Sequence, residues 1–211
     1  MYGNVALGRA YVRRGALDAR PVIIPGLLYQ PDYLTPAEQE ALLTRIDQQP
    51  WQTQLKRRVQ HYGYHYDYKK HRVNPSTYLG PLPLWLTPLT ERLHREGLFP
   101  ALPDQAILNE YEPGQGIASH VDCVPCFGDT IVSLSLGSPC VMIFSHTQSQ
   151  FQVPLLLEPG SLLVMKGEAR FLWKHGIPAR KTDRYEGRTL VRSRRISITF
   201  RTMLDSSLSQ V

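Results

Sequence analysis

Alternating apolar and polar residues in the second half of the chain constrain its fold more than any other feature. Between Thr130 and Leu136, serines alternate with leucines after an Ile-Val pair, and further apolar runs lie at 141–144, 162–165 and 196–200. Successive side chains of a strand point to opposite faces, so this period predicts β-strands. The runs are separated by turn residues, as in an antiparallel sandwich or barrel, at Pro113-Gly114, Gly137-Ser138-Pro139 and Pro159-Gly160.

Two helices are predicted before residue 105. Thr35 can cap a helix that has Pro36 in its first turn, and Glu38 completes a capping box. The first helix is therefore predicted to begin at Thr35 and to end before Pro50. A second amphipathic helix is predicted within 82–95, and its apolar face is formed by Trp85, Leu86, Leu89 and Leu93. We predict a mostly β fold with flanking helices, in which the N-terminal helices pack on one sheet.

The length and composition predict a single water-soluble domain. The 211 residues are 42% hydrophobic and 20% charged, which excludes disordered and collagenous classes. No apolar run approaches the roughly 20 residues of a membrane-spanning helix. We expect a domain over residues 21–205, preceded by an extension over residues 1–20 that lacks the apolar core of a secretory signal. These features predict a monomeric cytoplasmic protein that does not contact membranes, with a nuclear location equally compatible in a eukaryote.

The three cysteines predict free thiols. So small and odd a number is typical of a reducing compartment rather than of a disulfide framework. Cys123 and Cys126 have the spacing of a zinc-ligand pair, but a structural zinc site needs four ligands and the chain has no second pair. We therefore interpret both as loop thiols.

A His-x-Asp pair and a later histidine provide the ligand types of an iron site. On a strand, His120 and Asp122 point to the same side, and His175 follows further along the chain. Two imidazoles and one carboxylate form the facial triad of non-haem Fe(II) oxygenases, which leaves coordination positions for a cosubstrate and dioxygen.

A rival metal site is present in the sequence at His65 and Asp67, which have the same spacing, with His61 four residues before His65. That segment is aromatic and cationic and predicts a loop, whereas His120 precedes a regular strand. We therefore favour His120 and Asp122 over the rival pair.

The last predicted strand carries cations on one face. Alternation places Arg195, Ser197, Thr199 and Arg201 opposite the apolar Ile196, Ile198 and Phe200. Two guanidiniums directed into one cavity need an anion, and a dicarboxylate such as 2-oxoglutarate can pair with both. Asn109 and Tyr111, upstream of His120, can add an amide and a phenol to the same site. A solvated basic face on an edge strand is the alternative.

Together these motifs resemble those of the AlkB family of Fe(II)/2-oxoglutarate dioxygenases, in the same order and at similar spacing. Segments 108–144 and 161–177 look closest to the AlkB-like domain of the wobble-uridine tRNA hydroxylase. The resemblance covers about residues 20–203 and implies a double-stranded β-helix (jelly-roll) core that uses Fe(II), 2-oxoglutarate and O2. It implies that His120, Asp122 and His175 are the catalytic iron ligands. It also implies that the cosubstrate contacts are Asn109, Tyr111, Arg195, Ser197 and Arg201.

The segment 57–72, called the lid segment below, interleaves aromatic residues with cations and corresponds to the family's substrate lid. Bases stack on aromatic rings and Lys or Arg neutralise phosphates, so this composition fits a single-stranded or flipped nucleotide. The net charge of +6 also favours a polyanionic partner. A hairpin whose tyrosines cover the helices is the alternative. The candidate substrate contacts are Arg58, His61, Tyr62 and Tyr64.

A second basic stretch, 181–195, predicts a mobile loop near the mouth of the site.

The predicted function is a dioxygenase acting on nucleic acid, either single-stranded DNA or RNA, including tRNA. The first expectation is oxidative demethylation of N-alkylated bases. Hydroxylation of an N-methyl carbon gives a hydroxymethyl group that is lost as formaldehyde, while 2-oxoglutarate becomes succinate and CO2. Hydroxylation of a tRNA base or a protein side chain is the first alternative. A non-catalytic nucleic-acid-binding module is the second.

Overall fold

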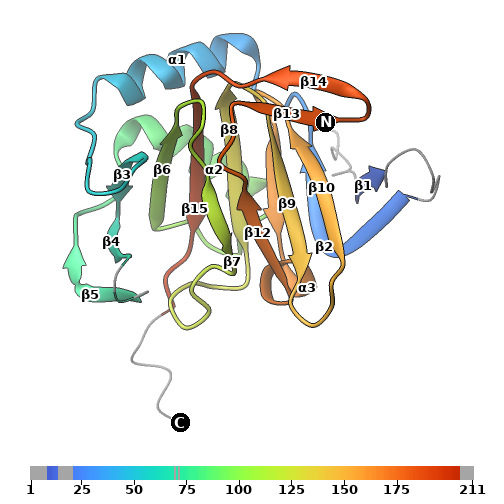
Figure 1. Cartoon of the computed structure of the whole chain (residues 1–211). Helices are drawn as coiled ribbons and strands as arrows, with labels where there is room; N and C mark the ends of the chain where they lie inside the picture. Colours follow the sequence, from blue (N-terminus) through green and yellow to red (C-terminus); the bar gives the residue numbers. More distant parts are fainter. Residues whose placement is uncertain (1–8, 14–20, 69, 71, 205–211) are drawn as a thin grey trace, which may run out of the picture.

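The computed structural model describes residues 9–13, 21–68, 70 and 72–204, and its two main β-sheets face each other (Figure 1). The larger sheet contains β1 (Arg9–Arg13), β2 (Pro21–Gln30), β3 (Arg58–Tyr62), β6 (Gln105–Tyr111), β8 (Ile131–Gly137), β11 (Leu162–Met165) and β15 (Arg195–Arg201). Their order is β1-β2-β11-β8-β15-β6-β3. The smaller sheet contains β10 (Gln152–Leu157), β9 (Cys140–His146), β12 (Trp173–Ile177) and β7 (Ile117–His120), in that order. The expected mostly β chain is confirmed, and the pairing, antiparallel throughout, is consistent with a jelly roll.

Two hydrophobic clusters cover the two faces of the larger sheet. One lies between the sheets and includes Leu163, Phe144 and Trp173. The other joins Ile198 of the larger sheet to residues of the helices α1 (Pro36–Asp47) and α2 (Thr87–Arg95). Burying each large apolar side chain contributes roughly 1.5–3 kcal/mol. The larger sheet is therefore a rigid platform for the polar side chains that point into the space between the sheets.

The first helix begins as predicted. Thr35 Oγ1 accepts a hydrogen bond from the Glu38 amide at 3.2 Å, and the Thr35 amide donates to Glu38 Oε2 at 2.7 Å. This capping box satisfies two amides that have no partner within the helix.

The second helix lies within the predicted range 82–95, with its α-helical part at the C-terminal end of that range. Residues Leu84–Leu86 form a short 3-10 turn, and α2 follows with Pro88 in its first turn. Proline has no amide hydrogen and is accepted only at the start of an α-helix, so the α-helix cannot extend back to residue 82.

The basic stretch 181–195 is a hairpin of β13 (Thr182–Tyr185) and β14 (Arg188–Val191) leading into β15, and the expected loop is wrong. The buried carboxylate of Asp183 fixes this hairpin. It accepts hydrogen bonds from Arg192 Nε at 2.6 Å, from Arg180 Nε at 2.7 Å and from the Val141 amide of β9 at 3.1 Å. The local cations therefore neutralise a buried acid and order the segment.

The N-terminal extension contributes β1, which pairs with β2 at the edge of the larger sheet. Residues 1–8, 14–20 and 205–211 lie outside the described residues. In the described part of the chain, no helix has the length and apolar character needed to cross a membrane.

Candidate active site

Two adjacent strands of the smaller sheet place His120 opposite His175. The two residues are register partners in the β7–β12 pair, and their ring centroids lie 4.5 Å apart. Gly176 permits this close approach, because a Cβ there would lie 2.9 Å from the backbone of Ser119. The histidines, 55 residues apart in the chain, are therefore brought together by strand pairing.

Asp122 follows β7 and lies beside both rings. Its Oδ2 atom is 3.8 Å from His175 Nε2 and is buried without a hydrogen-bond partner, while Oδ1 accepts from Arg201 Nη2 at 2.9 Å. His120 Nδ1 lies 2.8 Å from the Ala118 carbonyl oxygen. A carbonyl only accepts, so Nδ1 carries a proton and donates it, and Nε2 is the ring nitrogen left to face a metal. These three residues are called the candidate triad below.

The chemistry of the candidate triad fits a divalent metal. Two imidazoles and a carboxylate with an unpaired buried oxygen are the donors that non-haem iron takes. No three described His, Cys, Asp or Glu side chains are gathered closely enough to enclose an ion, so small side-chain rotations are needed to close this trio on one.

Electrostatics keep these groups in the ligand-competent forms. Burial lowers the pKa of His175 to about 3, and the neighbouring His120 adds to the effect, so the ring is neutral. Burial alone would raise the pKa of Asp122, but Arg201 and the two histidines outweigh it and hold the pKa well below its usual range. Metal ligation needs this combination of neutral imidazole and ionised carboxylate.

An inner cavity of about 50 Å³ lies between the sheets against the candidate triad. The polar face of β15 lines it, and its unpaired polar atoms are those of arginines. Arg195 Nε and Nη1 and Arg201 Nε are buried without partners. Buried guanidinium nitrogens are rarely left unpaired, so the cavity has the chemistry of an anion site. The polar side chains lining it are Asn109, Tyr111, His120, Ser133, His175, Arg195, Ser197, Thr199 and Arg201.

The two arginines stand at opposite ends of β15. Arg195 donates from Nη2 to Ser135 Oγ at 2.9 Å and lies 5.4 Å above the ring of Tyr111. Arg201 is at the candidate triad, beside Asp122. Asn109 and Tyr111 face Ser197 and Arg195 across the β6–β15 pair. The structure thus brings all eight sequence-predicted iron and cosubstrate residues to one region.

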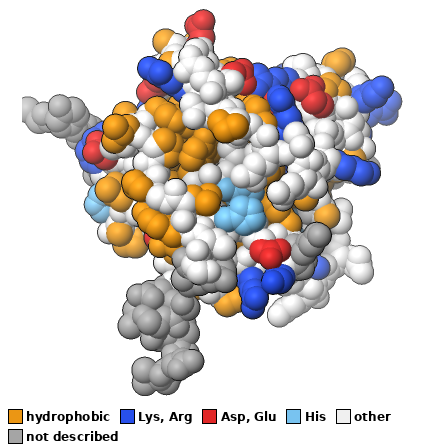
Figure 2. Space-filling view, turned by 90° about the vertical axis from the view of Figure 1, so that its left-hand side faces the viewer, with side chains coloured by type: hydrophobic (Ala, Val, Ile, Leu, Met, Phe, Trp, Pro, Cys, Tyr) orange, Lys and Arg blue, Asp and Glu red, His pale blue; other side chains and the backbone are white. Residues whose placement is uncertain are grey.

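An outer cavity of about 230 Å³ adjoins the inner one, and both are lined by Asn109, Ile117, His120 and Arg201. The lid segment contributes Arg57, Tyr66 and Tyr68 to this outer cavity, and Phe127 closes another side. Arg57 donates to Asn109 Oδ1 at 2.8 Å. The outer cavity therefore combines aromatic rings and a cation above the candidate triad. Figure 2 shows the face over the lid side of the molecule, where hydrophobic and histidine side chains gather and Lys and Arg lie around them.

The four residues predicted as substrate contacts do not line the outer cavity. Arg58 forms an ion pair with Glu110, and Tyr62 packs edge to face on Trp85 with ring centroids 5.8 Å apart. Tyr64 packs against Tyr78, on the short hairpin of β4 (Tyr64–Asp67) and β5 (Arg72–Tyr78), with ring centroids 4.9 Å apart. The predicted segment reaches the cavity, but through other residues.

His61 contacts Tyr68 of the outer cavity, and its ring lies 4.7 Å from that of His65, the other histidine of the rival metal site. The His61 and Asp67 atoms that this rival site would use as ligands have other partners. His61 Nδ1 lies 3.0 Å from Gln52 Oε1, and its Nε2 lies 3.2 Å from the hydroxyl of Tyr68. Both ring nitrogens therefore have partners. Asp67 Oδ1 accepts from the Lys70 amide at 3.0 Å, as in a turn.

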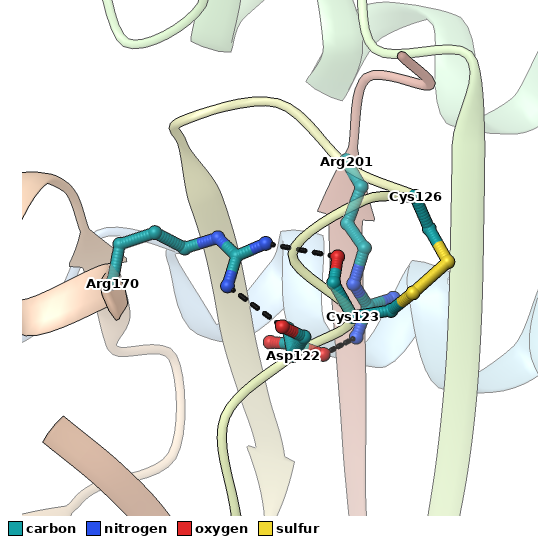
Figure 3. The surroundings of a disulfide bond; sticks show 5 residues. All are labelled: Asp122, Cys123, Cys126, Arg170 and Arg201. Atoms are coloured by element: carbon teal, nitrogen blue, oxygen red, sulfur yellow. Dashed lines mark hydrogen bonds and ion pairs between the residues drawn. A yellow bond between two sulfur atoms is a disulfide. The ribbon is translucent and has the colours of Figure 1, made fainter. Parts of the chain in front are cut away.

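Cys123 and Cys126 are joined by a disulfide, so the expected free thiols are wrong at these positions (Figure 3). The bond closes the short loop after Asp122. The number of cysteines indicates only whether a framework of several disulfides can form. It does not reveal a single disulfide between two cysteines three residues apart in one loop.

Thiol titration of the denatured protein is expected to find one reactive thiol, Cys140, without reductant and three after reduction. The control is Cys140→Ser, which should give none before reduction. Three thiols in the unreduced wild-type protein would contradict the disulfide.

A larger hollow of about 470 Å³ shares Ile117 with both cavities, and it is lined by residues including Ser119, Ile143, Gln152 and Pro178. None of its lining residues is acidic, basic, histidine or cysteine. It lacks the groups for metal binding or proton transfer, so the smaller cavities at the candidate triad form the better candidate site.

Residues 26–201 match the 2OG-Fe(II) oxygenase superfamily. The mouse mitochondrial alpha-ketoglutarate-dependent dioxygenase alkB homolog 7 is 35% identical over 195 residues, which are 90% of this chain and 81% of that protein. This chain is an AlkB-family 2-oxoglutarate-dependent dioxygenase. The cofactors that its family uses are Fe(II), 2-oxoglutarate and O2.

The dioxygenase is also similar to a domain of longer proteins. It is 42% identical over 168 residues to the Xenopus tropicalis tRNA (carboxymethyluridine(34)-5-O)-methyltransferase alkbh8, with 77% of this chain and 27% of that protein covered. It spans from 26% to 58% of the ALKBH8-type relatives. The solved structure of OsALKBH1 has the same fold, with a TM-score of 0.64 at 19% identity, covering 86% of this chain and 98% of that one.

Sequence reasoning missed several residues of the dioxygenase's site. Tyr66 and Tyr68 are two residues apart, the strand period, which was the available signal for a shared face. Arg170 gave no such signal, because its partners at the site are distant in the chain.

Proposed function

We propose that His120, Asp122 and His175 hold the Fe(II) of this dioxygenase. The observation that carries the proposal is the buried, unpaired Oδ2 of Asp122 beside two imidazoles. With Fe(II), 2-oxoglutarate and O2 held there, the site would supply the oxidation of a substrate C–H bond, coupled to conversion of 2-oxoglutarate to succinate and CO2. The protein's part is to hold and orient these reactants.

The inner cavity is the proposed site of 2-oxoglutarate. Its 50 Å³ holds only about one or two waters, so the lining side chains must move when the dicarboxylate enters. Arg195 pairs with one carboxylate through its free nitrogens, and Arg201 lies at the metal end. Asn109, Tyr111 and Ser197 complete the site through their hydrogen-bonding groups.

The outer cavity is the proposed site of a nucleic-acid base. The rings of Tyr66, Tyr68 and Phe127 offer stacking surfaces, and Arg57 offers a cation for a phosphate or a base edge. The net charge of +6 supports a polyanionic substrate. The adjoining position of the two cavities would bring a bound base next to the iron.

Two oxidations fit this arrangement. Oxidative demethylation of an N-alkylated base requires an N-methyl carbon at the iron, and the methyl leaves as formaldehyde. Hydroxylation of a tRNA base is favoured by one observation, the similarity to a relative named for a modified uridine at tRNA position 34. Both oxidations share the candidate triad and differ in the carbon that faces it.

Succinate formation measured with tRNA, methylated single-stranded DNA or a peptide separates the remaining alternatives. We expect stimulation by a nucleic acid over the rate without substrate. Stimulation only by the peptide would favour a protein side chain, and absence of any turnover would favour a non-catalytic binding module.

Tyr66→Ala is expected to weaken binding of a single-stranded oligonucleotide by about 1–3 kcal/mol, the usual value of one base stacked on an aromatic ring. The dependence of affinity on salt should stay unchanged, because stacking releases no counterion. Fluorescence anisotropy at several salt concentrations measures both quantities. Arg58→Ala is the matched control, since Arg58 does not line the outer cavity. An equal loss in both variants would sink the assignment of the outer cavity.

The cytoplasmic location and the monomeric state stay predictions. The mouse relative is named as mitochondrial. Sedimentation of the purified protein tests the monomer.

A further inference from the structure

Arg170 connects the loop that contains Asp122 to the segment of chain that leads into His175. It belongs to α3 (Gly167–Phe171), five residues before His175. Its guanidinium reaches across to the loop after β7, where Nη1 donates to the Asp122 carbonyl oxygen at 2.9 Å and Nη2 donates to the Cys123 carbonyl oxygen at 3.2 Å (Figure 3). We propose that Arg170 is a positioning residue that fixes Asp122 relative to His175, an inference that rests on the proposed function.

Arg170 is buried, and each of the three nitrogens of its guanidinium donates to a backbone carbonyl oxygen. The side chain is only 2% exposed, and Nε donates to a third carbonyl oxygen, that of Gly128, at 3.3 Å. Burying a cation against main-chain oxygens is costly, and burial lowers the pKa of this guanidinium. The planar guanidinium spreads its five donors over three nitrogens and so reaches three separate carbonyls, whereas the three donors of a lysine ammonium all diverge from one nitrogen. The contact therefore depends on arginine geometry.

The loop that Arg170 holds lies outside the strand ladder that carries the second histidine. The strand β7 ends at His120, so Asp122 lies beyond the ladder that pairs β7 with β12. The loop itself is compact, because the Cys123 carbonyl oxygen also accepts from the amides of Cys126 and Phe127 at 3.3 and 3.2 Å, and the disulfide closes it. Arg170 thus docks a preformed loop onto the chain that leads into His175.

Without Arg170, contacts that remain tie the loop to the end of β15, through Arg201 on Asp122 and through the backbone hydrogen bonds Gly128 N–Thr202 O and Leu204 N–Cys126 O, both 2.9 Å. Arg201 Nη2 already binds Oδ1 at 2.9 Å, whereas Oδ2 is the oxygen left for the metal. If the loop shifts together with Arg201, the Asp122 carboxylate moves relative to His175. The three side chains of the candidate triad then need larger rotations before they can surround a metal ion. The expected defect is therefore weaker metal binding rather than unfolding alone.

Mn²⁺ affinity of the folded protein, measured by calorimetry, tests the proposal without relying on turnover. Arg170→Met keeps the methylene chain and removes the donors. We expect it to weaken Mn²⁺ binding by about 10- to 100-fold, the usual cost of losing a group that orients a metal ligand. Arg170→Lys should recover part of the affinity, since an ammonium can still meet one carbonyl. Arg92→Met is the matched control, because Arg92 also donates to a carbonyl oxygen, that of Tyr33 at 2.8 Å, but beside α1 and α2.

Two results would overturn the assignment. If Arg170→Met lowers the melting temperature yet binds Mn²⁺ as the wild type does, Arg170 only stabilises the loop. If Arg170→Met fails to fold, Arg170→Lys decides, and wild-type Mn²⁺ affinity in that variant together with full turnover would reject the role. The same measurement distinguishes a failure of the proposed function. In that case the wild-type protein would not bind Mn²⁺, or Asp122→Ala would leave its Mn²⁺ affinity unchanged.

Discussion

The Asp122→Ala variant is expected to lose all measurable 2-oxoglutarate turnover while keeping its fold. Removing the carboxylate leaves two imidazoles, which cannot hold iron in the three-ligand geometry of the facial triad. It also leaves Arg201, 7% exposed, without its carboxylate partner. Succinate production measures the loss, and circular dichroism checks the fold. His120→Ala and His175→Ala should behave in the same way.

The controls for this prediction are His65→Ala and Asp67→Ala, which alter the rival pair and should leave turnover unchanged. Full turnover in Asp122→Ala would remove that residue from the site. Loss of turnover in the control variants would instead restore the rival site in the lid segment.

The Arg195→Lys variant should raise the KM for 2-oxoglutarate about 10- to 100-fold, because lysine keeps the charge but loses a charge-assisted hydrogen bond worth about 1.5–3 kcal/mol. Arg195 is 3% exposed, and its unpaired Nε and Nη1 are available for a two-pronged contact with a carboxylate. An ammonium supplies the charge without that fork. Steady-state kinetics with varied 2-oxoglutarate measures the change.

Arg188→Lys is the control for the cosubstrate prediction, since Arg188 is exposed on the β13–β14 hairpin and should show the wild-type KM. A wild-type KM in Arg195→Lys would mean that this arginine does not contact the cosubstrate.

The strands that form the site were predictable because their pattern is local. The run 162–165 coincides with β11, and alternation along β15 separates the apolar Ile198 from the cavity-facing Arg195 and Arg201. Alternation needs only neighbouring residues, so it survives without knowledge of the fold. The capping box at Thr35 was predictable for the same reason.

The lid contacts were not predictable, because the face that a lid strand turns to the cavity depends on pairing with a distant strand. Arg58 pairs in register with Glu110 of β6, and this long-range register decides the orientation of β3. Gly63 then ends β3 with a positive φ of 79°, and a Cβ there would lie 1.9 Å from the Asp104 carbonyl oxygen. The change of direction brings Tyr66 and Tyr68, rather than Tyr62, to the outer cavity.

The role of Arg170 was not predictable from the sequence either. Its partners Asp122 and Cys123 precede it by 48 and 47 residues, and nothing in the local pattern links them. The only local signal is a charged residue within the apolar run Ala169, Phe171, Leu172 and Trp173.

Mass spectrometry of nucleosides tests the central claim, oxidation of a nucleic-acid base at this iron site. Transfer RNA and methylated oligonucleotides are incubated with the protein, Fe(II), 2-oxoglutarate and ascorbate, and then digested to nucleosides. We predict that one nucleoside gains an oxygen atom or loses a methyl group with the wild-type protein and is unchanged with Asp122→Ala. Unchanged nucleosides in every sample, despite succinate formation by the wild type, would contradict the claim.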